Sequence, residues 1–240
     1  IMSSDWSSDV CSSDLHGVIT AVRKPFEEIY ESIRGIEKLL ILGCGTCVTV
    51  CMAGGEKEVQ VLASTIRLAN KKNDVDMEIA EATIERQCDR EFFDEIKEQI
   101  EWADAVLSMA CGVGVQFLGE LFEGTRVIPG LNTKFYGTTL EQGMWSERCA
   151  GCGDCVLDKF GGICPVARCS KSLLNGPCGG SQNGKCEVDP ENIDCAWQLI
   201  YDRLEQLGML YKLEENEPVK DWSTGRDGGP GKIVREDMAL

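Results

Sequence analysis

The sequence predicts an α/β protein in which a small parallel sheet is followed by an irregular, cysteine-rich segment and a carboxyl-terminal helix. Three observations predict this fold. Short apolar runs alternate with segments of helical periodicity over the first half of the chain. Eight of the fourteen cysteines then fall between Cys149 and Cys195, in a stretch rich in glycine and poor in apolar periodicity. Finally, residues 195–207 again carry apolar side chains at helical spacing.

The first half alternates expected strands with expected helices. We expect helices at 25–36, 48–70, 91–102 and 113–122, and strands at 38–42, 76–84, 103–110 and 126–128. Phe26, Ile29 and Ile33 recur at helical spacing, whereas 39–42 is an unbroken apolar run typical of a buried strand. This alternation is typical of βαβ units and predicts a Rossmann-like parallel sheet.

The chain has 240 residues, enough for one large domain or two small ones. We expect an α/β domain over 16–140, a cysteine-rich domain over 141–213 and a polar tail over 214–240. Ser-Ser-Asp recurs three times within residues 1–15, and residues 9–15 look like a translated sequencing adapter. We therefore set 1–15, with Cys11, apart as a non-native or disordered tail.

Charge and composition narrow the classes of function. The net charge is −16 and no cluster of Lys and Arg stands out, which argues against nucleic-acid binding. No apolar run approaches the roughly 20 residues that span a membrane, and residues 1–15 lack the apolar core of a secretory signal. We expect a cytoplasmic protein, in which clustered cysteines bind metal more often than they form disulfides.

The second half has cysteines at metal-ligand spacing. Cys149-x2-Cys152-x2-Cys155 matches the three-cysteine arm of bacterial ferredoxins, and Cys164-Pro165 follows at a longer spacing than usual. The remaining candidates are Cys169, Cys178, Cys186 and Cys195. Both iron–sulfur clusters and zinc accept four thiolates. The sequence therefore leaves open two clusters, one cluster with one zinc ion, or zinc alone.

A second set of cysteines follows the expected strands. Cys44, Cys47 and Cys51 come after the first strand, Cys88 after the second and Cys111 after the third. Because ligands bind at the carboxyl ends of parallel strands, we expect these cysteines to share a metal site. Cys51 can instead be a small core residue, as buried free cysteines often are. With one histidine, His16, no acid–base pair accompanies them, and the sequence predicts no catalytic residue.

Several motifs resemble a known family. The block Gly43-Cys44-Gly45-Thr46-Cys47-Val48-Thr49-Val50-Cys51 resembles the start of the cysteine-rich subunit of bacterial methylenetetrahydrofolate reductases. Residues 172–180, 184–188, 194–197 and 220–223 resemble later parts of that subunit. The resemblance runs from about residue 19 to residue 222 and is weakest at the two ends of the chain.

The resemblance implies a non-catalytic iron–sulfur subunit, as in acetogens, that carries about two or three [4Fe–4S] clusters. It would pass electrons to FMN in a catalytic partner, which reduces 5,10-methylene-tetrahydrofolate to 5-methyl-tetrahydrofolate in the acetyl-CoA pathway. Further electron-carrying subunits can belong to such a complex. Two other functions stay open: a zinc-stapled docking subunit of the same reductase, and a thiolate-zinc methyltransferase linked to folate.

Overall fold

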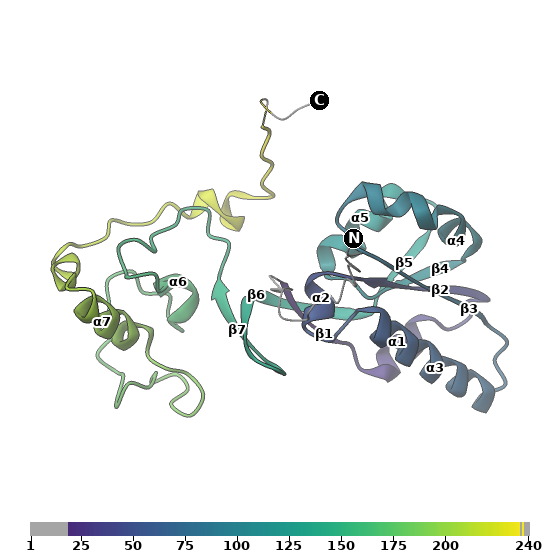
Figure 1. The fold of residues 1–240 in the computed structure, drawn as a ribbon, viewed down its shortest axis with the longest axis horizontal. Helices are drawn as coiled ribbons and strands as arrows, with labels where there is room; N and C mark the ends of the chain where they lie inside the picture. Colours follow the sequence, from purple (N-terminus) through teal and green to yellow (C-terminus); the bar gives the residue numbers. More distant parts are fainter. Residues whose placement is uncertain (1–18, 236, 238–240) are drawn as a thin grey trace, which may run out of the picture. The chain divides into compact units, whose positions relative to one another are not determined.

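The computed structural model describes residues 19–235 and 237. The chain divides into a first unit that ends at Ser146 and a second unit that starts at Glu147 (Figure 1). The expected polar tail from 214 onward thus belongs to the second unit. The expected amino-terminal tail, with Cys11, and also His16 lie outside the described residues. Within the described part, no helix is long and apolar enough to cross a membrane.

The first unit is built on a four-stranded parallel sheet with the strand order β3-β2-β4-β5. The strands are β2 (Lys38–Cys44), β3 (Glu78–Ile84), β4 (Ala105–Ser108) and β5 (Arg126–Pro129). β2 pairs in parallel with β3 on one side and with β4 on the other, so the strand order reverses between β2 and β4. The parallel sheet predicted from the sequence is confirmed, and its switch point lies at the end of β2.

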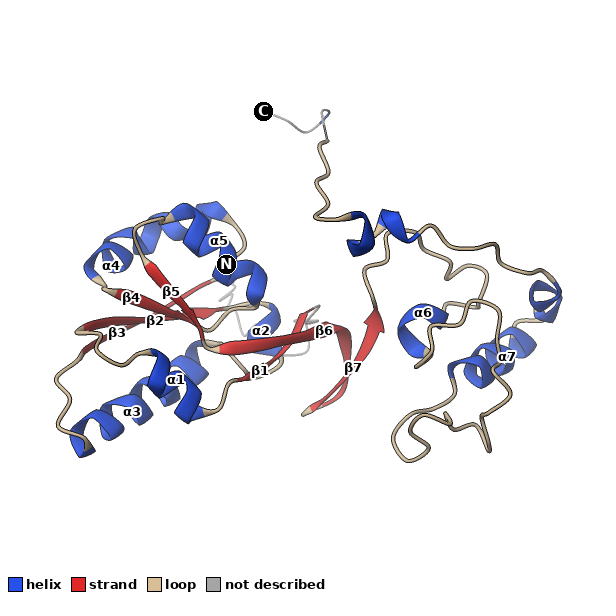
Figure 2. Ribbon diagram, turned by 180° about the vertical axis from the view of Figure 1, so that it is seen from behind, coloured by secondary structure: helices blue, strands red, loops and turns tan. Residues whose placement is uncertain are grey.

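Helices cover both faces of this sheet (Figure 2). They are α1 (Phe26–Ser32), α3 (Glu56–Lys72), α4 (Lys97–Trp102) and α5 (Gly112–Leu121). Leu39 and Ile41 of β2 pack with α1 and α3, whereas Leu40 and Leu42 pack with α4 and α5. Successive side chains of a strand point to opposite faces, so burial of both faces explains the unbroken apolar run.

Two expected helices have different bounds in the structure. The helix expected at 48–70 is two helices, because the one-turn α2 (Cys47–Val50) ends before α3 begins. The chain turns between them at Met52, which has a left-handed φ of 51°. The helix expected at 91–102 starts as a 3-10 helix, η1 (Arg90–Ile96), and becomes α-helical only in α4.

An additional antiparallel sheet has the order β1-β6-β7. It comprises β1 (Ile19–Arg23), β6 (Leu131–Glu141) and β7 (Met144–Cys149). The sequence analysis does not predict this sheet. Its longest strand, β6, is mostly half-buried or exposed and carries Asn, Thr and Lys, so it lacks the apolar pattern of a core strand.

The second unit has little regular structure. It contains α6 (Pro165–Arg168), α7 (Ala196–Gln206) and the short 3-10 helices η2 (Leu210–Glu214), η3 (Trp222–Thr224) and η4 (Arg226–Gly228). Its small core comprises Phe160, Trp197, Ile200 and Leu204 with Cys195. The rings of Phe160 and Trp197 meet edge to face at 5.4 Å. A core of this size is typical of domains that depend on cross-links or bound metal.

Candidate metal centres

Four cysteines lie around the carboxyl edge of the parallel sheet. Cys44 ends β2, Cys47 begins α2, Cys88 lies in the loop after β3, and Cys111 precedes α5. Burial raises the pKa of the Cys88 thiol, and three neighbouring thiols raise it further. These neighbours are Cys44, Cys111 and Cys47. The thiol of Cys88 therefore lies within electrostatic range of three other thiols, next to the switch point of the sheet.

A buried glutamine connects the strand ends at this site. The side-chain nitrogen of Gln87 donates to the carbonyl oxygens of Leu42 at 2.9 Å and Gly43 at 3.0 Å. Its side-chain oxygen accepts a 2.6 Å hydrogen bond from the hydroxyl of Ser108. Helix α5 can pack closely against Gln87 because residue 114 is glycine. A Cβ at that position would lie 2.7 Å from the Cβ of Gln87. Gln87 thus fixes the loop that carries the next residue, a cysteine, against β2 and β4.

Cys51 has a different environment. It is buried beside β1, where its sulfur accepts a hydrogen bond from the backbone N–H of Ala21 at 3.5 Å. Its thiol can donate to the carbonyl oxygen of Cys47 at 3.4 Å, one helical turn earlier. Burial raises the pKa of the Cys51 thiol, which favours the neutral form. These contacts match the core role that the sequence left open as an alternative for this residue.

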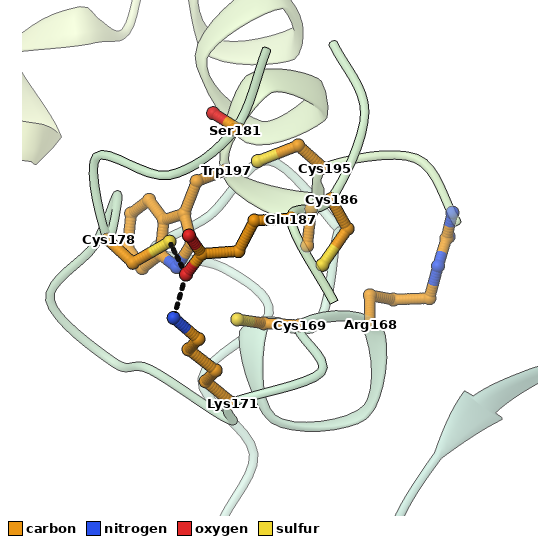
Figure 3. A pocket seen from close by; sticks show the side chains of 10 residues that line it. Arg168, Cys169, Lys171, Cys178, Ser181, Cys186, Glu187, Cys195 and Trp197 are labelled. Carbon is orange, nitrogen blue, oxygen red and sulfur yellow. Dashed lines mark hydrogen bonds and ion pairs between the residues drawn. The ribbon is translucent and has the colours of Figure 1, made fainter. Parts of the chain in front are cut away.

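In the second unit, a second group of four cysteines lines one pocket: Cys169, Cys178, Cys186 and Cys195. Figure 3 shows their sulfur atoms arranged around the same space. Cys169 follows α6 and Cys195 precedes α7, while the other two come from the connecting loop. Two backbone hydrogen bonds hold that loop together: Cys186 donates to Ile193 at 2.9 Å, and Cys195 donates to Gly184 at 2.8 Å.

Polar groups beside this pocket favour the ionised form of one of its thiols, that of Cys186. The hydroxyl of Ser170, 3.4 Å from the sulfur of Cys186, lowers the pKa of that thiol, and backbone N–H groups lower it further. Lys171 pairs with Glu187 and holds the pKa of that carboxyl below its usual range. Glu187 also accepts a 3.6 Å hydrogen bond from the thiol of Cys178 (Figure 3). Thiolate is the form of cysteine that binds metal.

Two of the remaining four cysteines of this unit have a backbone N–H directed at their sulfur. The N–H of Gly151 donates to the sulfur of Cys149 at 3.4 Å, and the N–H of Ala167 donates to the sulfur of Cys164 at 3.4 Å. Gly151 has a φ of 64°, in the left-handed region that favours glycine. Backbone N–H groups directed at ligand sulfurs are typical of iron–sulfur sites, where they stabilise the negative charge.

A single zinc ion and a [4Fe–4S] cluster both take four thiolates, but they differ in how far apart these ligands lie. Within residues 19–235 and 237, no three Cys, His, Asp or Glu side chains are arranged so that they could hold one metal ion. Four thiolates on one zinc ion lie about 3.8 Å apart, given a Zn–S bond of about 2.3 Å. A [4Fe–4S] cluster is a larger body and takes one thiolate on each iron. The four cysteines around the shared pocket supply the number of thiolates that either centre takes.

The structure thus places four predicted ligands around one pocket of the second unit and four more near the strand ends of the first unit. Cys51 is buried in the core of the first unit, as are Cys44 and Cys111. The sequence analysis missed the groups that position the cysteines, above all Gln87 and Ser108. A lone polar residue beside a cysteine has no pattern that marks it as buried. A fold-level signal existed, because both residues lie at the carboxyl ends of expected strands.

A comparison with protein families relates the second half of the chain to a known enzyme. A family model described as "Methylene-tetrahydrofolate reductase C terminal" matches residues 128–223. The match includes the eight cysteines between Cys149 and Cys195 and excludes the group around Cys88. No curated protein and no solved structure matches the chain. Residues 128–223 are therefore similar to a carboxyl-terminal domain of methylene-tetrahydrofolate reductase.

Proposed function

We propose that the chain is an iron–sulfur electron-transfer subunit of a methylenetetrahydrofolate reductase complex. It delivers electrons to FMN in a catalytic partner that reduces 5,10-methylene-tetrahydrofolate to 5-methyl-tetrahydrofolate. The observation that carries this proposal is the pocket lined by four cysteines inside the region matched by the reductase family. The family match supports the link with the reductase, and the cysteines support the redox role.

The cysteines divide into three proposed ligand groups of four. The first contains Cys44, Cys47, Cys88 and Cys111, and the second contains Cys169, Cys178, Cys186 and Cys195. Because that pocket already has four thiols, we assign Cys164 to the third group, together with Cys149, Cys152 and Cys155. Cys51 is left out, because its sulfur contacts backbone groups in the core.

The chain's own residues hold the ligand sulfurs and balance their charge. When bound, a [4Fe–4S] cluster accepts and releases one electron at a time. Backbone N–H groups and lysine side chains near the thiolates offset the negative charge that this adds. We assign the folate and flavin sites to the partner, in keeping with the absence of predicted catalytic residues in the sequence.

Electron transfer to the partner tests this function. The chain is purified anaerobically with the flavin-carrying subunit, and the loss of flavin absorbance is followed after reductant is added. We expect flavin reduction with the wild-type chain and with Cys51→Ala, and at least tenfold slower reduction with Cys186→Ser. A chain loaded with iron that leaves the flavin oxidised would overturn the electron-transfer role.

The same preparation separates the alternatives. Stoichiometric zinc without iron, with retained binding of the catalytic subunit, would instead indicate a docking subunit. Methyl transfer by the chain alone, without flavin or partner, would indicate a folate-linked methyltransferase. Both outcomes contradict the proposal in different ways.

A further inference from the structure

Residues 217–225 of the second unit, named here the strap, fold back onto the cysteine loop 149–155. The strap is anchored at Glu217. The carboxylate of Glu217 forms a 2.6 Å ion pair with Lys159. The side chain of Asn175 donates to the carbonyl oxygen of Glu217 at 2.9 Å and accepts from its N–H at 2.8 Å. These bonds fix the start of the strap on its own unit.

The far end of the strap contacts the cysteine loop directly. The hydroxyl of Thr224 donates a 2.9 Å hydrogen bond to the carbonyl oxygen of Cys152. Gly225 packs against the same residue, and a Cβ at Gly225 would lie 3.1 Å from its backbone. On the other side of the contact, Gly153 has a φ of 80° and lies against the carbonyl of Thr224, where no Cβ would fit. The close approach of the two segments therefore requires glycine at position 153, while a side chain at position 225 would be tight.

Lys220 lies in the middle of the strap and is buried. Its side chain is 2% exposed, and its ammonium donates to the carbonyl oxygen of Asp154 at 2.7 Å. The carboxylate of Asp154 is 3.4 Å away but 61% exposed, so water screens much of its charge. The ammonium also lies 5.8 Å from the centre of the Trp222 ring. A buried ammonium is costly unless its surroundings are negative.

Bound thiolates would make these surroundings negative. Asp154 lies between Cys152 and Cys155, and the sulfur of Cys152 is 3.6 Å from the carbonyl oxygen that Lys220 binds. In a trans peptide, the carbonyl and the following N–H point in opposite directions. Holding the carbonyls of Cys152 and Asp154 on the strap therefore directs the next N–H groups to the other side of the loop.

We propose that the strap holds the loop 149–155 in its metal-binding shape and that Lys220 is its main positioning residue. The identity of the metal rests on the proposed function, whereas the clamping of the loop does not. Beyond Cys149, the last residue of β7, the loop has no regular structure of its own, so ordering it costs conformational entropy. The strap supplies this order in advance, and its positive charge offsets the charge of the ligand thiolates.

Hydrogen–deuterium exchange of the full-length chain tests the strap. We expect amides of residues 149–155 to exchange about ten- to a hundredfold faster in Lys220→Met than in the wild type, with α7 unchanged. Lys220→Arg keeps the charge and should restore most of the protection. Lys212→Met is the matched control, because Lys212 donates to the carbonyl oxygen of Asp158 at 2.9 Å but is only partly buried.

Metal release provides a second readout. Iron should pass to a ferrous chelator, or zinc to EDTA, faster from Lys220→Met and Thr224→Val than from Lys212→Met. If Lys220→Met does not fold, the result for Thr224→Val decides whether the strap holds the loop. Thr224→Val removes only one hydroxyl from the surface and should therefore leave the fold intact. Unchanged loop exchange and metal release in Thr224→Val and Lys220→Met would overturn the strap, as would equal acceleration in Lys212→Met.

The two proposals fail separately. A chain that contains only zinc overturns the electron-transfer function, while loop exchange still tests the strap. A chain with full iron content, whose strap variants show the same loop exchange and metal release as the wild type, overturns only the strap.

Discussion

The side-chain oxygen of Gln87 accepts a 2.6 Å hydrogen bond from the hydroxyl of Ser108. Both residues are 0% exposed. The bond joins the loop after β3 to the end of β4, and the same amide group donates to two carbonyls at the end of β2. One buried side chain therefore connects the three strand ends that carry the cysteines of the first unit.

Replacing Gln87 tests this connection. Gln87→Leu removes the acceptor of the Ser108 hydroxyl and one donor from each of two backbone carbonyls, at a cost of about 1–3 kcal/mol for each group left unsatisfied. The carbonyl oxygen of Leu42 keeps the N–H of Met109 at 2.8 Å. We expect unfolding at lower denaturant concentration and loss of metal from the first unit. Gln60→Leu is the control, since Gln60 is an exposed glutamine whose side chain donates to Glu56 at 3.4 Å. Equal stability and metal content in the two variants would contradict this role.

Cys51 and Cys88 should differ as metal ligands. Cys51→Ala removes a buried sulfur bonded to backbone and should cost about 1 kcal/mol of stability with no loss of metal. Cys88→Ala should lose the metal of the first unit, because its thiol lies among three others. Iron and zinc analysis of the two purified variants makes the comparison. Metal loss in Cys51→Ala would return this residue to the ligands that the sequence predicts.

The grouping of the cysteines predicts which double substitutions are additive. Cys178 and Cys186 line one pocket, so replacing both with serine should remove no more iron than replacing one. Cys186→Ser combined with Cys88→Ser should remove about twice as much, since these cysteines belong to different groups. The iron content of single and double variants measures this. Additive loss for the first pair would show that the two cysteines hold separate centres.

Lys220 should raise the reduction potential of the neighbouring centre. A reduced cluster carries one more negative charge, which a buried ammonium stabilises. Lys220→Met should therefore shift the midpoint potential to more negative values, and Lys220→Arg should shift it less. A redox titration followed by electron paramagnetic resonance measures the potential. A shift to more positive values in Lys220→Met would contradict the electrostatic role.

The sequence predicts the parallel sheet well, because burial of β2 on both faces leaves an unbroken apolar run from Leu39 to Leu42. The antiparallel sheet is not predictable in this way, since β6 is largely solvent-accessible and its pairing with β1 joins residues more than a hundred positions apart. The start of α3 is also missed, because α2 ends in a turn that interrupts the helical pattern.

The candidate sites, like the fold, are predictable from the sequence only in part. That ligands gather at the carboxyl ends of parallel strands is enough to group Cys44, Cys88 and Cys111. The contacts of the strap cannot be predicted from the sequence, because its hydrogen bonds run from Lys220 and Thr224 to backbone carbonyls of the cysteine loop. Backbone acceptors exist at every residue, so no sequence pattern marks the ones that a distant side chain binds.

The metal content of the anaerobically purified chain tests the central claim most directly. Iron, acid-labile sulfide and zinc are counted per chain, and the absorption spectrum is recorded. We expect about four iron and four sulfide for each four-cysteine group, or about twelve of each per chain, with broad absorbance that bleaches on reduction. Stoichiometric zinc with neither iron nor sulfide would contradict the electron-transfer account.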